Sequence, residues 1–358
     1  MAVGLPAKTT YADGDVFSAS DINDTNGTLN LVGQTTNFYA GKNKVINGDF
    51  GIWQRGTSFS TNNVYTADRW YVTGDGSPTF TLSQQTFTAG TAPVAGYEGQ
   101  YFARYAVTSA GGSTYRQLQQ QIEDVRTFAG QTITISFWAR INSGTVTGNY
   151  VRWNQVFGSG GSATVNGSSN NFTLTSSWQR FTVTTSVTSI SGKTIGTSSY
   201  LGIDFVLPFT TTMSVDFWGV QVEAGSTATA FQTATGTIQG ELAACQRYYY
   251  RLPALTASNR YLGNGMAWSA TASMIGFTYP VTMRIRPTAL EQSGTAADYA
   301  TVRSQSSTDN CTAVPVYSVS TSSSMGWVSG TSANLVAGNA TMFYTNNTNA
   351  YLAWSAEL

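Results

Sequence analysis

The sequence predicts an all-β protein: an N-terminal arm with a short helix, a central jelly-roll β-sandwich, a linking helix and a C-terminal β-sandwich. Three observations predict this class. Apolar and polar residues alternate in many short segments, which is typical of half-buried antiparallel strands. Turn-forming stretches such as Gly158–Ser162 separate these segments. A clear helical period interrupts the strand pattern only near residues 237–252.

Residues 1–42 are the expected arm. The stretch is polar and rich in Asp, Asn, Thr and Gly, and a helix-start signal at Ser18–Asp21 predicts one short helix. Its apolar residues at helical spacing, Ile22, Leu29 and Val32, are too few to form a core. We therefore expect the arm to become ordered only against another subunit or a docking partner.

Residues 43–236 carry the strongest alternation. In Gln131–Ile141, Ile, Phe and Ala residues fall on one face of the predicted strand, and Thr, Ser and Arg residues fall on the other. The same period of two recurs in segments 181–187, 201–207 and 213–217. Many short strands without intervening helices predict a jelly roll or another sandwich.

A helix is predicted over residues 237–252, where it links two β-domains. Its apolar stripe at helical spacing consists of Ile238, Leu242, Cys245 and Tyr249. Pro253 is expected to stop this helix. Strand-like segments then return at 273–286, 314–320 and 351–356, which predicts a smaller C-terminal β-sandwich over residues 253–358.

The composition excludes several functional classes. Lys plus Arg and Asp plus Glu are balanced at 18 each, so the chain has no basic footprint for nucleic acid. The absence of His excludes Ser-His-Asp and Cys-His catalysis, and we expect no enzymatic activity. Cys245 and Cys311 are expected to be reduced, buried thiols. No apolar run reaches the roughly 18 residues of a membrane span, so no membrane insertion is expected.

Several separate motifs follow one another along residues 43–358. They are Asn47–Phe50, Ile52–Gly56, Tyr65–Trp70, Phe217–Gly225, Glu241–Leu242, Cys245–Tyr249, Tyr279–Arg284, Pro287–Thr288 and Ala356–Leu358. In this order they resemble the motifs of phage tail-fibre and appendage proteins, which carry a jelly roll similar to carbohydrate-binding modules. Within the arm, Asp13–Asp21 resembles the N-terminal attachment segments of such fibres.

The resemblance implies a virion protein that is assembled in the cytoplasm of a bacterial host. It implies a homotrimer that attaches to other virion proteins through residues 1–42 and presents its β-domains to host-surface polysaccharide. The protein would then be a tail fibre or receptor-binding protein whose weak sites act through avidity. The alternative is a capsid decoration or tail-assembly protein that binds no glycan.

Aromatic residues beside hydrogen-bonding groups are the candidates for carbohydrate binding. Sugar rings pack their C–H faces on Trp and Tyr, while Asn and Arg bind the hydroxyls. The candidates in the central domain are Tyr150, Arg152, Trp153 and Asn154. In the C-terminal domain, Trp268 and Trp327 lie in or beside loop-like sequence. For each aromatic residue, packing in a core is the competing interpretation.

Two further sets of oxygen-bearing residues are candidates for a site. Related carbohydrate-binding modules hold a structural Ca²⁺ with their first and last strands, which nominates Asn47, Asp49 and Glu223. Calcium needs about six to eight oxygens, so a turn cap at Asp49 and an Arg ion pair at Glu223 compete with this hypothesis. No other cofactor is expected. Asp204 and Asp216, expected on adjacent strands, are a candidate carboxylate pair for glycoside hydrolysis, with solvated side chains as the alternative.

Overall fold

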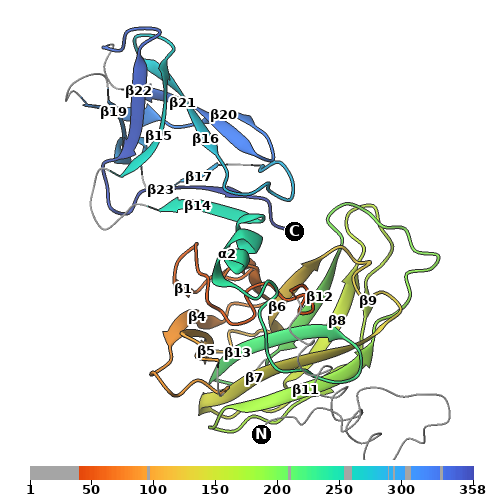
Figure 1. Cartoon of the computed structure of the whole chain (residues 1–358). Helices are drawn as coiled ribbons and strands as arrows, with labels where there is room; N and C mark the ends of the chain where they lie inside the picture. The colour runs from red at the N-terminus through yellow and green to blue at the C-terminus, as the bar shows by residue number, and fades with distance from the viewer. Residues whose placement is uncertain are drawn as a thin grey trace, which may run out of the picture.

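The computed structural model shows a chain built almost wholly of β-strands (Figure 1). It describes residues 40–94, 97–208, 211–253, 260–288, 290–292, 295–302, 308–330 and 334–358. Within these ranges there is a single α-helix, and the predicted all-β class is confirmed. No helix in these ranges is long and apolar enough to cross a membrane. The predicted arm helix lies outside the described residues.

The central domain is a sandwich of two antiparallel sheets. The six-stranded sheet contains, in spatial order, β1 (Ser58–Phe59), β4 (Thr79–Thr86), β5 (Tyr101–Ser109), β13 (Met213–Ala224), β7 (Thr132–Gly144) and β11 (Gln179–Ser186). The seven-stranded sheet contains β10 (Asn170–Asn171), β8 (Tyr150–Val156), β12 (Tyr200–Val206), β6 (Arg116–Glu123), β3 (Trp70–Gly74) and β2 (Val64–Tyr65), with β9 (Val165–Asn166) paired to β8. Consecutive strands repeatedly pass from one sheet to the other, as the predicted jelly roll requires.

The hydrophobic core of the central domain lies between these two sheets. The alternating apolar residues of the predicted strands point into it, among them Phe137 on β7 and Phe205 on β12. Their ring centroids are 4.8 Å apart in an edge-to-face contact, and Phe217 on β13 extends the cluster with its ring 5.4 Å from Phe205. Burial of each such Phe contributes about 1.5–3 kcal/mol, so the alternation supplies most of what holds the sheets together.

The linking helix is confirmed but is shorter than predicted. Helix α2 covers Ile238–Gln246, and the hydroxyl of Thr237 caps it by accepting a hydrogen bond from the backbone N–H of Gly240 at 3.1 Å. Residues 249–253 form a strand instead of the predicted last helical turn. The predicted apolar stripe is only partly buried, because Ile238 and Leu242 are exposed whereas Cys245 is buried.

The strand that replaces the end of the predicted helix is β14 (Tyr249–Pro253). It pairs along its whole length with β23 (Tyr351–Ser355), which arrives from the other end of the C-terminal domain. Propensity and capping signals near residue 250 are local, whereas this partner is about a hundred residues away in sequence. The tertiary pairing therefore overrides the helical pattern.

The C-terminal domain consists of a small sheet and a larger sheet. The small sheet has the order β14, β23 and β17 (Leu290–Gln292). The larger sheet has the order β16 (Ala272–Thr278), β15 (Tyr261–Ala267), β22 (Ala340–Thr345), β18 (Tyr299–Val302), β19 (Thr308–Ala313), β21 (Ser323–Gly330) and β20 (Val316–Val319). A further pairing of β16 with β21 closes the larger sheet on itself. Trp354 packs against Phe277 at 5.2 Å and joins the two sheets in one core.

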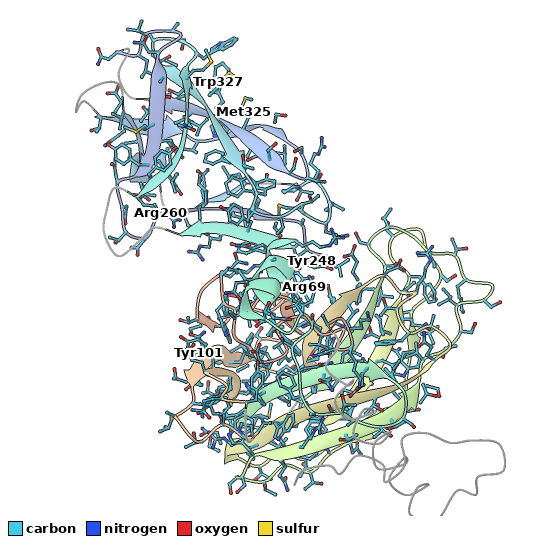
Figure 2. The ribbon with its side chains drawn as sticks, in the orientation of Figure 1. Arg69, Tyr101, Tyr248, Arg260, Met325 and Trp327 are labelled. Atoms are coloured by element: carbon cyan, nitrogen blue, oxygen red, sulfur yellow. The ribbon has the colours of Figure 1, made fainter. Side chains whose placement is uncertain are left out.

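Buried charges hold the two domains together next to α2. Arg69 forms an ion pair with Glu357, and its guanidinium lies 3.6 Å from the ring of Tyr248 (Figure 2). The backbone N–H of Ala356 donates a hydrogen bond to the carbonyl of Tyr248 at 2.7 Å. The segment after β23 thus lies against the central domain, and α2 lies beside it.

Candidate functional site

The seven-stranded sheet of the central domain has one face toward the core and one face outward. On β12 the core-facing residues are Leu201, Ile203 and Phe205. The residues between them, Tyr200, Gly202 and Asp204, therefore occupy the outer face. The strand register places Asp204 opposite Arg152 on β8 and opposite Gln119 on β6. Because directly opposite residues share a face, polar side chains from three strands gather there.

We call this surface the polar face. It comprises Tyr65, Tyr71, Gln119, Gln121, Tyr150, Arg152, Asn154, Tyr200 and Asp204. All of these residues are on strands of a rigid sheet, so their positions are determined by the register rather than by loops. Such a scaffold holds binding groups in place before a ligand arrives.

Asp204 is the centre of the polar face. One carboxylate oxygen accepts a hydrogen bond from Gln119 Nε2 at 2.7 Å. The other accepts from Asn154 Nδ2 at 2.6 Å and from Arg152 Nε at 3.1 Å. The side chain is fully buried, and this burial raises the pKa of Asp204 although its donors and Arg152 act in the opposite direction. The carboxylate therefore serves to orient its three neighbours.

The hydrogen-bond network continues across the sheet toward the domain junction. Gln121 Nε2 donates to Gln119 Oε1 at 2.8 Å, and the hydroxyl of Tyr65 donates to Gln121 Oε1 at 2.5 Å. These side chains are thereby held in single orientations.

One acceptor on the polar face has no partner. Asn154 Oδ1 is buried and receives no hydrogen bond from the described residues. Gly202 leaves the space for it, since a Cβ atom at residue 202 would lie 2.0 Å from this oxygen. An unsatisfied buried acceptor costs about 1–3 kcal/mol, and a donor brought by water or a ligand would remove that cost.

Four half-exposed tyrosines surround the polar centre. Tyr65 and Tyr71 lie together, with ring centroids 5.0 Å apart. Tyr150 lies beside Arg152, whose guanidinium is 5.9 Å from its ring. Burial and the charge of Asp204 raise the pKa of Tyr200 to about 12, so its hydroxyl stays protonated and can both donate and accept.

The structure brings together three of the four candidate residues predicted in this domain. Tyr150, Arg152 and Asn154 all lie on the polar face. The prediction for Trp153 is wrong, because its side chain is only 3% exposed and packs in the core. Its indole N–H donates to Thr185 Oγ1 at 3.3 Å. Trp153 is one residue away from Arg152 and Asn154 on a strand, so it necessarily points to the opposite side of the sheet.

Sequence reasoning missed the other half of the polar face. Gln119 and Gln121 lie two residues apart on β6, and this period of two was a usable signal within Arg116–Glu123. Tyr71 lies within β3 and Tyr200 begins β12, and nothing local indicates that these strands are near β6. Their proximity follows only from the strand order of the jelly roll.

Trp268 and Trp327 come together on the C-terminal domain. Their ring centroids are 5.9 Å apart, and Trp268 is 56% exposed. The register places Met266 opposite Met274, and Met274 opposite Trp327, on the outside of the larger sheet. We call these four residues the Trp–Met row. Trp327 lies in the part of this domain remote from the junction (Figure 2).

The three candidate calcium ligands have internal partners. Asn47 Oδ1 accepts from the backbone N–H of Ile52 at 2.9 Å. The oxygens of Asp49 accept from the backbone N–H of Gly51 and from the hydroxyl of Tyr97, which supports the turn-cap interpretation.

Glu223 accepts hydrogen bonds from both the backbone and the hydroxyl of Thr229, at 2.9 and 2.8 Å. It forms an ion pair with Lys42 at 3.2 Å where the competing interpretation expected an Arg. Over the part of the chain that the structure describes, no three His, Cys, Asp or Glu side chains form a group suited to a metal. A structural calcium at Asn47, Asp49 and Glu223 stays a prediction.

Asp204 and Asp216 are not on adjacent strands, so that prediction is wrong. Strand β12 belongs to the seven-stranded sheet and β13 to the six-stranded sheet. Asp216 is on the outer face of its own sheet, where it accepts from Arg104 Nε at 2.7 Å and from Arg140 Nε at 2.9 Å. Packed sheets are about 10 Å apart, and the two carboxylates point away from each other. They cannot flank one glycosidic bond.

Comparisons with known proteins find similarity only among solved structures. No protein-family model matches the chain, and no curated protein matches it. The enzymatically active domain of tailspike protein 4 from bacteriophage CBA120 is 13% identical, with a TM-score of 0.34, over 51% of this chain and 22% of that chain.

Two smaller proteins are similar over almost their whole length. A CBM4 structure is 20% identical, with a TM-score of 0.32, over 51% of this chain and 99% of that chain. A Stig cyclase from Fischerella sp. TAU is 17% identical, with a TM-score of 0.34, over 51% of this chain and 97% of that chain. At these identities and TM-scores the matches assign no family to the chain.

Proposed function

We propose that this protein binds bacterial surface polysaccharide through the polar face, as a tail fibre or receptor-binding protein of a virion. The observation that carries the proposal is the Asp204 network, with its unsatisfied Asn154 oxygen, surrounded by half-exposed tyrosines. The proposal includes no catalysis, since Asp204 and Asp216 are on opposite sides of the sandwich.

The chemistry of the polar face suits a saccharide. Sugar hydroxyls donate and accept hydrogen bonds, and the face offers the guanidinium of Arg152 and phenol hydroxyls at fixed positions around the buried carboxamides. A hydroxyl that donates to Asn154 Oδ1 would satisfy the buried acceptor. The exposed parts of Tyr71, Tyr150 and Tyr200 provide apolar surface for the C–H faces of sugar rings.

The charge of the polar face favours neutral sugar units. The carboxylate of Asp204 and the guanidinium of Arg152 are paired at 3.1 Å and largely cancel each other. A polyanionic ligand would find little net attraction in a chain whose acidic and basic residues are balanced at 18 each. We therefore expect neutral or weakly charged polysaccharides to bind best.

Virion attachment and a homotrimer complete the proposal. They are supported by the tail-fibre motifs and by the arm of residues 1–42. Three copies of a weak site on one fibre would raise the apparent affinity by avidity. In this arrangement Trp268 and Trp327 provide an additional aromatic contact for glycan at the outer end of the molecule.

The test is binding of the full chain to an array of bacterial lipopolysaccharides and capsular polysaccharides. Double substitution of Tyr150 and Tyr200 by Ala removes two aromatic rings on which a sugar can pack. Each ring contact contributes about 0.5–1.5 kcal/mol to the binding free energy in addition to the burial of its surface, so the affinity should fall about ten- to hundredfold. Tyr101→Ala is the matched control, because Tyr101 is half-buried on the other sheet (Figure 2). Equal binding by the double variant would refute the assignment of the polar face.

A second candidate function is a capsid decoration or tail-assembly protein without glycan binding. The exposed Trp–Met row favours it, because apolar surface of this kind is also typical of protein contacts. A protein of this type binds empty capsids or tails and no polysaccharide on the array. That result would replace the proposed function.

A further inference from the structure

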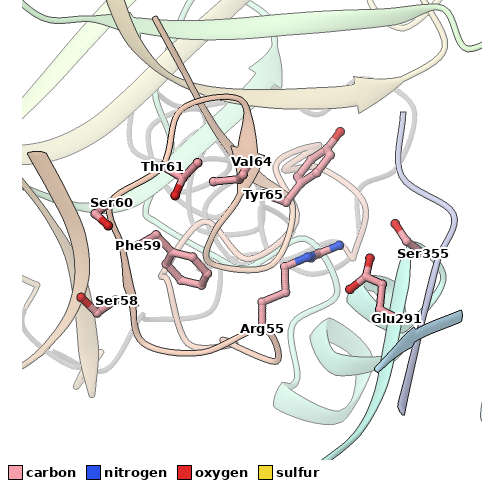
Figure 3. Close-up of a pocket in the computed structure, with 9 residues that line it drawn as sticks. All are labelled: Arg55, Ser58, Phe59, Ser60, Thr61, Val64, Tyr65, Glu291 and Ser355. Atoms are coloured by element: carbon pink, nitrogen blue, oxygen red, sulfur yellow. The ribbon is translucent and has the colours of Figure 1, made fainter. Parts of the chain in front are cut away.

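A pocket with a volume of about 460 Å³ lies between the two domains (Figure 3). We call it the junction pocket. Its walls on the central domain include Arg55, Phe59, Thr61 and Tyr65, and the C-terminal domain contributes Glu291 and Ser355. The pocket therefore exists only while the domains are docked.

The charged groups of the junction pocket are held in place. Arg55 Nη2 lies 3.2 Å from Glu357 Oε1, and its guanidinium is 3.5 Å from the centre of the Tyr249 ring. The hydroxyl of Tyr249 also donates to Glu291 Oε2 at 3.1 Å. Arg55 Nη1 is buried and has no hydrogen-bond partner among the described residues. Tyr249 thus contacts both the guanidinium of Arg55 on one side of the pocket and the carboxylate of Glu291 on the other, and it orients both groups.

The remaining lining indicates the class of ligand. Phe59 and Tyr65 supply partly exposed ring surface, and the hydroxyls of Thr61 and Ser355 supply weak donors and acceptors. Pockets of about 300–1,000 Å³ accommodate small ligands, which corresponds here to one or two sugar units. Because Arg55 is already paired with Glu357 and Glu291 is itself acidic, the pocket has no net positive charge, and a neutral polyol suits it better than an anion does.

We propose that the junction pocket is a second saccharide site, which takes one or two neutral sugar units and requires both domains. The ligand class rests on the proposed function, but apart from Tyr65, which lies at the edge of both, the residues are different from those of the polar face. Because a ligand contacts both walls, its binding favours the docked arrangement of the domains. Glycan capture would thereby stiffen the connection between the central and the C-terminal domain.

The experiment uses the full chain and saturation-transfer NMR with maltose, lactose and cellobiose at millimolar concentration. Thr61→Trp fills the mouth of the pocket from an exposed loop position. Thr57→Trp is the matched control, since Thr57 is also exposed but does not line the pocket. We expect at least one disaccharide to bind, Thr61→Trp to weaken it at least about tenfold, and Thr57→Trp to leave it unchanged.

The double Ala variant of Tyr150 and Tyr200 separates the two proposals. If the junction pocket is a distinct site, this variant keeps disaccharide binding while it loses polysaccharide on the array. A second readout is the melting temperature, which the disaccharide should raise in the wild type and not in Thr61→Trp. The junction site is refuted if no disaccharide binds, or if only the polar-face variant abolishes the signal.

Discussion

Glu357→Gln is expected to uncouple the two domains. The Glu357 carboxylate pairs with Arg69 and Arg55, and the Glu357 and Arg69 side chains are only 6% and 1% exposed. The substitution keeps the shape of the side chain and removes its charge. The Arg69 guanidinium would then be buried without a counter-ion, in contact only with neutral groups such as the Gln121 carbonyl and the Tyr248 ring.

The loss of stability in Glu357→Gln follows from the burial of the Arg69–Glu357 pair. Removal of one partner from a buried ion pair costs about 3–5 kcal/mol, because the other charge is left uncompensated. A Gln side chain still accepts one hydrogen bond from Arg69, so the lower half of this range is the expected loss. Asp124→Asn makes the same change in an exposed pair, whose Arg126 and Asp124 side chains are 61% and 43% exposed. There the loss should be at most about 1 kcal/mol.

The assay is calorimetric melting combined with limited proteolysis of the full chain. Glu357→Gln should lower the temperature of the first melting transition and make the segment around α2 (Ile238–Gln246) accessible to protease. The same data test whether residues 43–236 and 253–358 are separate folding units, because uncoupled domains melt in two steps. If Glu357→Gln and Asp124→Asn have equal effects, the junction does not depend on the buried charge.

Four further outcomes are expected. Asp204→Ala leaves the buried side-chain donors of Gln119 and Asn154 without an acceptor, and it should lower the free energy of unfolding, measured in urea, by about 2–5 kcal/mol. A decrease below about 0.5 kcal/mol would contradict the central role of Asp204. Burial acts to raise the pKa of Glu223, but its hydrogen bonds together outweigh burial and lower the pKa. The ionised carboxylate therefore stabilises the folded state above its ordinary pKa, and this contribution is lost as the pH falls through the lowered pKa. Glu223→Gln should reduce this loss of stability at acid pH. Burial raises the pKa of Cys311 to about 12 and that of Cys245 well above its ordinary value, so a thiol reagent should label neither cysteine until urea unfolds the chain. EDTA should leave the melting curve unchanged, and a lowered melting temperature would instead support the calcium hypothesis.

Much of the architecture could be predicted from local patterns. The alternation in Gln131–Ile141 appears as strand β7 with Ile135 and Phe137 in the core. The two cysteines are free and buried, as predicted. The same period of two was sufficient to place Arg152 and Asn154 on one face. The same period places Trp153, which lies between them on the strand, on the opposite face.

The sequence by itself determined which residues alternate, and therefore which side chains can share a face, because side-chain direction along a strand is a local property. Only the tertiary structure decided which strands are neighbours. It separated Asp204 from Asp216, brought Gln119 to Asp204, and turned the end of the predicted helix into a strand paired with Tyr351–Ser355. Strand pairing and domain docking join segments that are far apart in the chain, and no local period carries that information.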